Sequence, residues 1–158
     1  MITLLLAAAL VAPSDAAYEA ILKKDGRVYA AHYLDAIEVN IRPELRECLA
    51  PIVAAIRYAE NGTTYQYGII HKRCPKGYRP QAGWCAATVQ KNYDRWVKAG
   101  SKGEFIIFLG KRYCPIGADN DPTGLNKHWI KNVRAITARF TGTNHNSSRV
   151  YSRRFLRR

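Results

Sequence analysis

The spacing of apolar residues predicts a mainly helical chain, and its clearest helix ends at a glutamate. Within residues 49–60 the apolar positions recur every three or four residues, as on the buried face of a helix. These positions are Leu49, Ile52, Val53, Ile56 and Ala59. Pro51 suits the first helical turn, and Asn61-Gly62 suits the stop. Glu60 therefore lies at the edge of a buried face, directly before a turn.

Three later segments repeat this helical pattern. A helix over residues 83–98 has an inner stripe of Cys85, Val89, Tyr93 and Trp96. A short helix over residues 105–113 follows Ser101 and Glu104, whose spacing is that of a capping box. A last helix over residues 127–140 begins after Asn126, a good N-cap. Its apolar stripe consists of Trp129, Val133, Ile136 and Phe140.

One segment has a strand pattern instead. Residues 65–70 are aromatic and β-branched, which favours a short strand or hairpin after the Glu60 helix. The predicted fold class is therefore mainly α (α+β), with one small β element. We place the compact domain at residues 42–140, since residues 17–41 indicate only one or two short helices and form an N-terminal extension.

The amino terminus resembles an export signal. Residues 2–12 are apolar apart from Thr3, and a stretch this short cannot span a bilayer, which takes about 20 residues. Small residues around Ser14 and Ala16 suit cleavage, so residues 1–16 are interpreted as a signal peptide of a secreted or periplasmic protein. A buried N-terminal helix or a misassigned start would also explain the stretch.

The four cysteines leave their chemistry open. Cys48, Cys74, Cys85 and Cys114 allow three disulfide pairings. A Cys74–Cys85 bond would close the turn-rich loop between them, whereas four buried thiols would be equally ordinary in a reducing compartment. Because the chain has no CxxC pair, a structural zinc site is not expected, and we predict no metal and no cofactor.

The net charge of the chain indicates which classes of binding partner to expect. Lys and Arg number 25 against 12 Asp and Glu, a net charge of +13, so the surface favours polyanions. Nucleic acid, anionic lipid and the anionic bacterial envelope all remain candidates. Lys127, Lys131 and Arg134 form a basic stripe on the last helix, and residues 141–158 form a basic tail.

Glu60 is the candidate catalytic group. A carboxyl set in an apolar wall has a raised pKa, holds its proton near neutral pH and can donate it, as glycoside hydrolysis requires. The alternative is a solvated surface glutamate, which is the commoner state of this residue type.

Five segments resemble the lysozyme-like superfamily, which includes goose-type lysozymes, lytic transglycosylases and related chitinases. The resemblance covers roughly residues 42–133. Its first part is Ala55-Ile-Arg-Tyr-Ala-Glu-Asn-Gly62, which looks like the catalytic-glutamate segment. The other parts are residues 67–69, residues 83–88 with Asn92 and Trp96, residues 108–115, and residues 120–129.

The resemblance implies a glycosidase or lytic transglycosylase that cleaves β-1,4 links between amino sugars of peptidoglycan, with Glu60 as general acid. A sugar-binding cleft needs flat apolar faces and hydrogen-bonding edges, for which the candidates are Tyr65, Tyr67, Tyr113, Asn120, Asn126 and Trp129. Trp129 could equally be a core residue, and Asn126 only an N-cap. The expected partners are peptidoglycan or a related amino-sugar polymer and the anionic cell envelope.

A second carboxylate is harder to assign. Asp94 is explained by a helical pair with Lys98, while Asp119 and Asp121 suit a turn. A non-catalytic wall-binding relative and a basic nucleic-acid-binding protein remain the alternative functions.

Overall fold

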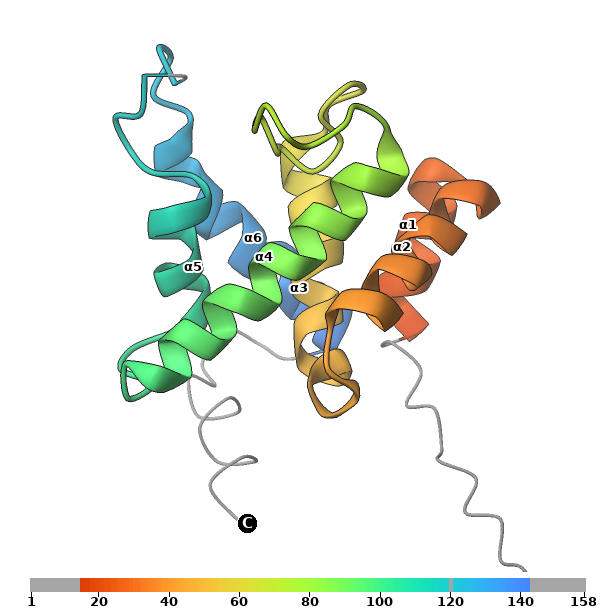
Figure 1. The fold of residues 1–158 in the computed structure, drawn as a ribbon, viewed down its shortest axis with the longest axis horizontal. Helices are drawn as coiled ribbons and strands as arrows, with labels where there is room; N and C mark the ends of the chain where they lie inside the picture. The colour runs from red at the N-terminus through yellow and green to blue at the C-terminus, as the bar shows by residue number, and fades with distance from the viewer. Residues whose placement is uncertain (1–14, 120, 143–158) are drawn as a thin grey trace, which may run out of the picture.

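Helix α3 (Arg46–Glu60) occupies the centre of the molecule, and the other helices pack around it (Figure 1). Every residue from Leu49 to Arg57 is buried, so this helix is enclosed on all sides along its middle. The computed structural model describes residues 15–119 and 121–142. The remaining elements are α1 (Asp15–Asp25), α2 (Arg27–Asn40), a 3₁₀ turn (Pro43–Leu45), α4 (Tyr78–Lys98), α5 (Phe105–Tyr113) and α6 (Asn126–Thr141).

The N-terminal helices belong to the same core as α3. Ile21 of α1 and Tyr33 and Ile37 of α2 are fully buried in that core. Tyr33 donates a hydrogen bond to the carbonyl oxygen of Ala50 at 2.9 Å, which ties α2 to the middle of α3. The predicted separation of residues 17–41 from the domain at residue 42 therefore does not correspond to a break in the core.

The predicted helices are present, but several of their starts differ. Helix α4 begins at Tyr78, five residues earlier than expected. Helix α5 has Glu104 as its N-cap without a side-chain cap bond, so the predicted capping box from Ser101 is wrong. Ser101 has a φ of 52°, a turn conformation that is not that of an N-cap residue. Asn126 is the first residue of α6 and not its N-cap.

The predicted β element is also wrong. Across residues 15–119 and 121–142 there is no β-strand, and residues 65–70 form a turn followed by irregular backbone. The side chain of Gln81 takes the place of a partner strand: its Nε2 donates to Ile69 O at 2.9 Å, and its Oε1 accepts from Ile69 N at 3.2 Å. Gln81 is fully buried in α4, so this clamp satisfies the backbone of Ile69 without a sheet.

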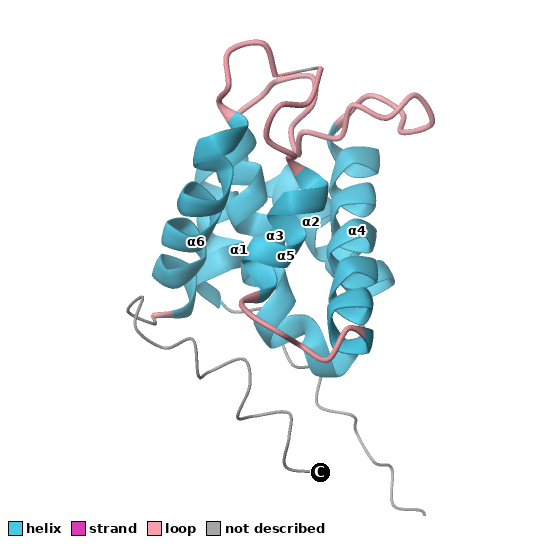
Figure 2. Cartoon of the chain, turned by 90° about the vertical axis from the view of Figure 1, so that its left-hand side faces the viewer, coloured by secondary structure: helices cyan, strands magenta, loops and turns pink. Residues whose placement is uncertain are grey.

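Long loops gather at one end of the helical bundle (Figure 2). The loop after α3 and the loop between α5 and α6 meet there, beside the last turn of α3 and the first turn of α6. The loop-rich end of the bundle is where Glu60 lies.

All four cysteines are free thiols. None of the helices within the described ranges is long and apolar enough to cross a membrane.

Candidate active site

Glu60 borders a cavity of about 550 Å³ at the loop-rich end of the bundle. The walls come from the end of α3, from residues 68–70, from residues 113–115 and from the region that opens α6. Among the lining residues are Glu60, Gly68, Ile70, Tyr113, Cys114, Asp121, Thr123, Leu125, Asn126, His128, Trp129 and Asn132. The cavity is therefore lined by one glutamate together with polar and aromatic side chains from four separate parts of the chain.

The Glu60 carboxyl is held by an indole. Trp129 Nε1 donates a hydrogen bond to Glu60 Oε1 at 2.8 Å. The Trp129 ring is only 5% exposed and stacks on Tyr113, with ring centroids 5.3 Å apart and an interplanar angle of 23°. Trp129 is thus a core residue and a cavity-lining residue at once, and its N–H fixes which oxygen of Glu60 stays available.

Gly68 presses against the same carboxyl. A Cβ atom built on Gly68 would lie 2.4 Å from both Cδ and Oε2 of Glu60, well inside van der Waals contact. Gly68 also has a φ of 71°, where side chains are rarely tolerated. Glycine is therefore required here both by the backbone and by the carboxyl it touches.

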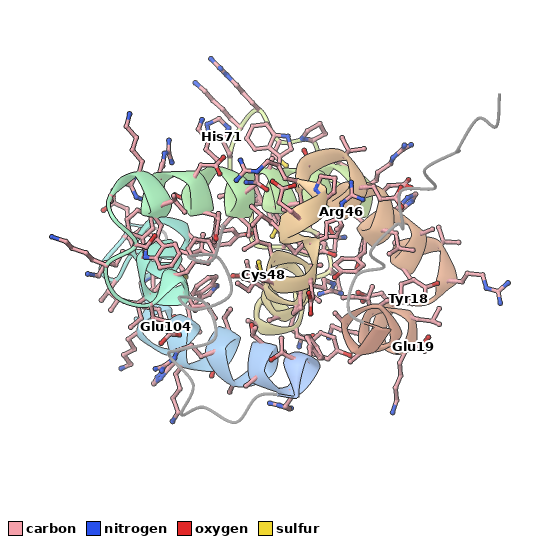
Figure 3. The ribbon with its side chains drawn as sticks, turned by 90° about the horizontal axis from the view of Figure 1, so that it is seen from below. Tyr18, Glu19, Arg46, Cys48, His71 and Glu104 are labelled. Carbon is pink, nitrogen blue, oxygen red and sulfur yellow. The ribbon has the colours of Figure 1, made fainter. Side chains whose placement is uncertain are left out.

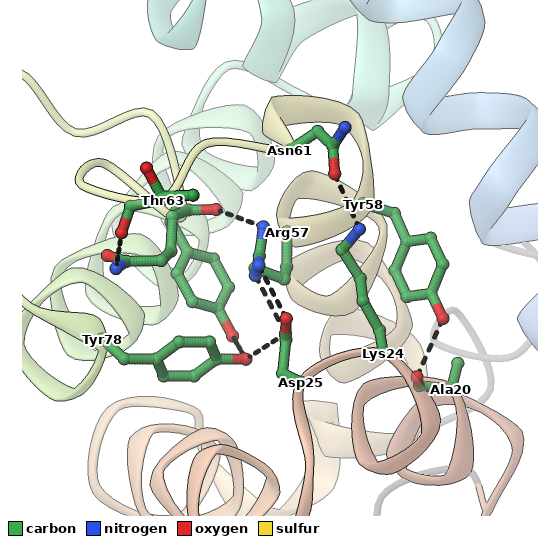
Figure 4. Close-up of polar contacts among 10 residues, drawn as sticks. Ala20, Lys24, Asp25, Arg57, Tyr58, Asn61, Thr63 and Tyr78 are labelled. Carbon is green, nitrogen blue, oxygen red and sulfur yellow. Dashed lines mark hydrogen bonds and ion pairs between the residues drawn. The ribbon is translucent and has the colours of Figure 1, made fainter.

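The segment before Gly68 is tied down by buried tyrosines and an ion pair (Figure 4). Tyr113 donates to Tyr67 O at 2.5 Å, and the Tyr67 hydroxyl donates to the Tyr78 hydroxyl at 3.1 Å. Tyr78 in turn donates to Asp25 Oδ2 at 2.9 Å. These bonds join α1, α4 and α5 to the backbone next to Gly68.

Arg57 completes this network from α3. Its Nη2 and Nε bind the two carboxylate oxygens of Asp25 at 2.6 and 2.9 Å, a bidentate pair that is almost fully buried. Its Nη1 donates to Gln66 O at 3.4 Å. The helix that carries Glu60 therefore also holds the loop that packs against Glu60.

Burial sets the protonation of the cavity groups. Desolvation raises the pKa of Glu60, and the hydrogen bond from Trp129 offsets part of that rise. Desolvation also raises the pKa of Cys114 to about 12, helped by the nearby Glu60 and Asp121 charges, so its thiol stays neutral at physiological pH. Tyr113 likewise has a pKa well above its ordinary value because it is buried. The cavity-lining carboxyl of Glu60 therefore stays protonated to higher pH than an ordinary glutamate does.

The structure brings three of the six expected sugar-contacting residues together at the cavity. Tyr113, Asn126 and Trp129 lie at the cavity with Glu60. Tyr67 is fully buried in the core, so the expectation that its ring faces a sugar is wrong. Tyr65 is 36% exposed but is not part of the cavity wall. Asn120 lies outside the described residues.

Of the three candidates for a second carboxylate, only Asp121 borders the cavity. Asp121 borders the cavity, where its two oxygens accept from the backbone N–H groups of Leu125 and Asn126 at 2.8 and 3.0 Å. It therefore caps the start of α6, the role that was expected of Asn126. Asp94 lies far along α4, where it pairs with Arg42 at 2.9 Å rather than with Lys98. Neither Asp94 nor Asp119 lines the cavity.

Sequence reasoning missed several lining residues. Asn132 follows Trp129 by three residues and His128 by four, so the periodicity of the last helix could have placed Asn132 near both. Thr123 lies in the loop before α6, within residues 120–129 that carry part of the resemblance, but no pattern singles it out there. Asn126 itself donates from Nδ2 to Pro115 O at 2.8 Å, which joins two walls of the cavity.

The part of the chain that the structure describes holds no group of three His, Cys, Asp or Glu side chains arranged to bind a metal ion. No protein-family model, curated protein or solved structure matches the chain.

Proposed function

We propose that this protein cleaves glycosidic bonds between amino sugars of peptidoglycan or a related polymer, with Glu60 as general acid. The observation that carries the proposal is the Glu60 carboxyl, whose pKa is raised by burial while it borders a cavity of about 550 Å³. A raised pKa lets the carboxyl hold its proton to higher pH than an ordinary glutamate, and a carboxyl of this kind can give its proton to a leaving oxygen.

The proton would leave from Oε2. Because Oε1 accepts the Trp129 N–H, Oε2 is the oxygen left to carry the acidic hydrogen. Transfer of that hydrogen to the glycosidic oxygen breaks the bond to the anomeric carbon, releases one sugar as an alcohol and leaves Glu60 ionised. Positive charge then develops on the other sugar ring, close to the new carboxylate.

Two fates are open to that sugar. Attack by water, oriented by a group such as Asp121 in the same cavity, gives a hydrolysed end and returns a proton to Glu60. Attack by a hydroxyl of the same sugar gives an internal anhydro ring, with Glu60 accepting the hydroxyl proton. Only the first route needs a second group to hold the water.

The remaining walls suit an amino sugar. Asn126, Asn132 and Thr123 supply amide and hydroxyl groups for hydroxyls and N-acetyl groups, and Tyr113 with Ile70 supplies apolar surface. The net charge of +13 would concentrate the protein on an anionic wall, which agrees with the secreted or periplasmic location expected from the amino terminus.

The test is Glu60→Gln, which keeps an oxygen that can accept the Trp129 N–H. We expect the parent protein to clear a suspension of purified peptidoglycan, and the variant to clear it about 10²- to 10⁴-fold more slowly, the usual contribution of a general acid. An unchanged circular dichroism spectrum would show that the variant is folded. Equal clearing by both proteins would refute the role of Glu60.

The products distinguish the two routes and the alternatives. Mass spectrometry of the fragments would show reducing ends after hydrolysis, or masses lower by one water after transglycosylation. If the parent binds peptidoglycan without releasing fragments, the protein is a wall-binding relative instead. Retention on DNA that salt abolishes, with no action on peptidoglycan, would favour the nucleic-acid function.

A further inference from the structure

A second hollow, of about 600 Å³, lies along the first half of α4. We call it the Trp84 groove, after the half-buried indole that borders it. It is also bordered by Asn40 at the end of α2, by Pro75 before α4, and by Pro80, Thr88 and Lys91 of α4. None of these residues lines the Glu60 cavity.

The groove combines flat apolar surface with a few polar groups. The Trp84 ring and two proline rings provide the apolar part, while Asn40, Thr88 and Lys91 provide an amide, a hydroxyl and a cation. His71 stacks on Trp84, with ring centroids 5.4 Å apart and an interplanar angle of 27°, which steadies the indole. Aromatic faces of this kind pack against the C–H face of a sugar ring, and the polar groups bind its hydroxyls.

The surroundings of the groove are strongly basic. No aspartate or glutamate occurs between Glu60 and Asp94, whereas this stretch holds Lys72, Arg73, Lys76, Arg79 and Lys91. All five are exposed. Arg79 forms only a weak ion pair with Asp35 of α2, because the two groups are 3.9 Å apart and both side chains are exposed. Figure 3 shows nitrogen-tipped side chains projecting beyond His71 at this edge of the molecule. The local field therefore favours an anionic occupant.

Consecutive residues connect the groove to the Glu60 cavity. Ile70 lines the cavity, and the next residue, His71, stacks on the indole of the groove. Gln81 clamps Ile69 to α4, and Trp84 follows Gln81 by three residues on that same helix. The residues that border the two hollows are thus linked through one short segment that Gln81 holds in place.

We propose that the Trp84 groove is a second, non-catalytic binding site for an anionic amino-sugar polymer, which it holds beside the cleavage site. This inference rests on the proposed function, because the polymer is the one that Glu60 would cut. The groove would bind sugar rings by stacking on Trp84 and the carboxylates of the polymer through Lys91 and the neighbouring cations.

Binding is tested in the Glu60→Gln background, where no polymer is consumed. The probe is insoluble purified peptidoglycan, and the readout is the protein that cosediments with it at moderate salt. We expect Trp84→Ala and Lys91→Glu each to weaken binding about tenfold, equivalent to about 1.4 kcal/mol. Lys98→Glu is the matched control, since it makes the same charge change at the far end of α4. It should weaken binding less than about twofold, as a distant exposed charge is screened.

Catalysis gives a second, independent readout with Glu60 intact. Trp84→Ala should act on the insoluble polymer about tenfold more slowly at limiting substrate, because weaker binding raises KM. Its turnover of a short soluble oligosaccharide, which fills the Glu60 cavity alone, should match the parent. Trp84→Phe should restore much of the polymer binding because it keeps a flat ring. Lys91→Glu covers the case in which Trp84→Ala does not fold.

Each outcome decides the matter. Equal losses in Lys91→Glu and Lys98→Glu, or equal slowing on the polymer and on the oligosaccharide, would overturn the groove as a site. Trp84-dependent retention of a single-stranded oligonucleotide in place of peptidoglycan would overturn it in favour of nucleic acid. If polymer binding depends on Trp84 but the parent releases no fragments, the groove stands and the cleavage function fails.

Discussion

At the scale of single residues, the candidate site depends on what touches one carboxyl. Trp129 donates to one oxygen of Glu60, and Gly68 leaves no room for a side chain next to the other. The carboxyl is therefore confined between an indole and a backbone segment. Confinement of this kind fixes the orientation of the carboxyl at the cavity wall, and it makes the glycine as important to that orientation as the tryptophan.

Gly68→Ala tests that confinement. The added methyl would lie 2.4 Å from Glu60 Oε2, so the carboxyl or the segment must move. A displacement of about 1 Å at a reacting group typically costs about a hundredfold in rate, and we expect a loss of that size in peptidoglycan clearing. Gly117→Ala is the control, because Gly117 has a similar φ of 76° but open space around it. Comparable losses in both variants would mean that backbone strain alone is responsible.

At the scale of elements, the segment after α3 shows how a single side chain replaces a strand. Residues 65–70 have strand-like composition, yet their backbone is held by the amide of Gln81 in α4, which pairs with Ile69, and by the Tyr113 hydroxyl of α5, which donates to Tyr67 O. The segment is thus positioned by the helices on which it lies. Its geometry should respond directly to changes in α4.

Gln81→Leu tests the clamp. Leucine has similar volume but leaves Ile69 N and Ile69 O without their partner, and each buried unpaired group costs about 1–3 kcal/mol. We expect a lower free energy of unfolding in urea and faster hydrogen exchange at the Ile69 amide. Gln90→Leu, at a half-buried position of the same helix, should cost less, because its hydrogen bonds with Arg42 N and Asp94 are exposed and water can replace them. Unchanged exchange at Ile69 would show that the clamp does not hold the segment.

The sequence predicted the elements well where periodicity is strong and failed where tertiary contacts decide. The stripes of the four later helices were readable because one face of each is buried. Residues 65–70 were misassigned because β-propensity reports fit to a half-buried surface, and here an amide supplies the pairing. Asp121 was interpreted as a turn residue because its hydrogen bond with Leu125 N is a contact between residues close in sequence. Its position on the cavity wall depends on contacts between distant parts of the chain, which the sequence does not show.

The site itself was partly predictable for the same reason. Glu60 and Trp129 could be proposed because each ends or begins a readable apolar stripe. Tyr67 could not be separated from Tyr113 by residue type, although one is buried and the other borders the cavity. The N-terminal helices were weakly patterned, with many alanines, and their place in the core depends on contacts with α3 and α4.

At the scale of the whole molecule, the half-buried carboxyl of Glu60 links folding to pH. Its pKa is raised in the folded chain, so the unfolded chain releases this proton at lower pH than the folded chain does. The contribution of Glu60 to stability is fully present below the unfolded-state pKa. It is lost as the pH rises through the raised folded-state pKa, because the folded protein must then bury a charge.

The stability of Glu60→Gln should reveal this linkage. The variant cannot ionise at this position, so its free energy of unfolding relative to the parent should rise with pH across that window and then level off. Urea unfolding of both proteins at about pH 4, near the ordinary glutamate value, and again at about pH 8 would measure it. A difference that does not change with pH would mean that Glu60 ionises as freely as in the unfolded chain.

The ion pair between Asp25 and Arg57 limits how far the chain can be shortened from its N-terminus and still fold. Asp25 is the last residue of α1, and its carboxylate binds both Arg57 of the central helix and the Tyr78 hydroxyl of α4. A shortened protein that began at residue 42 would keep Glu60 and the whole cavity wall. It would, however, leave the buried guanidinium of Arg57 without its counter-ion and the Tyr78 hydroxyl without its acceptor. The smallest autonomous unit therefore includes the first helical hairpin, however ordinary its residues look.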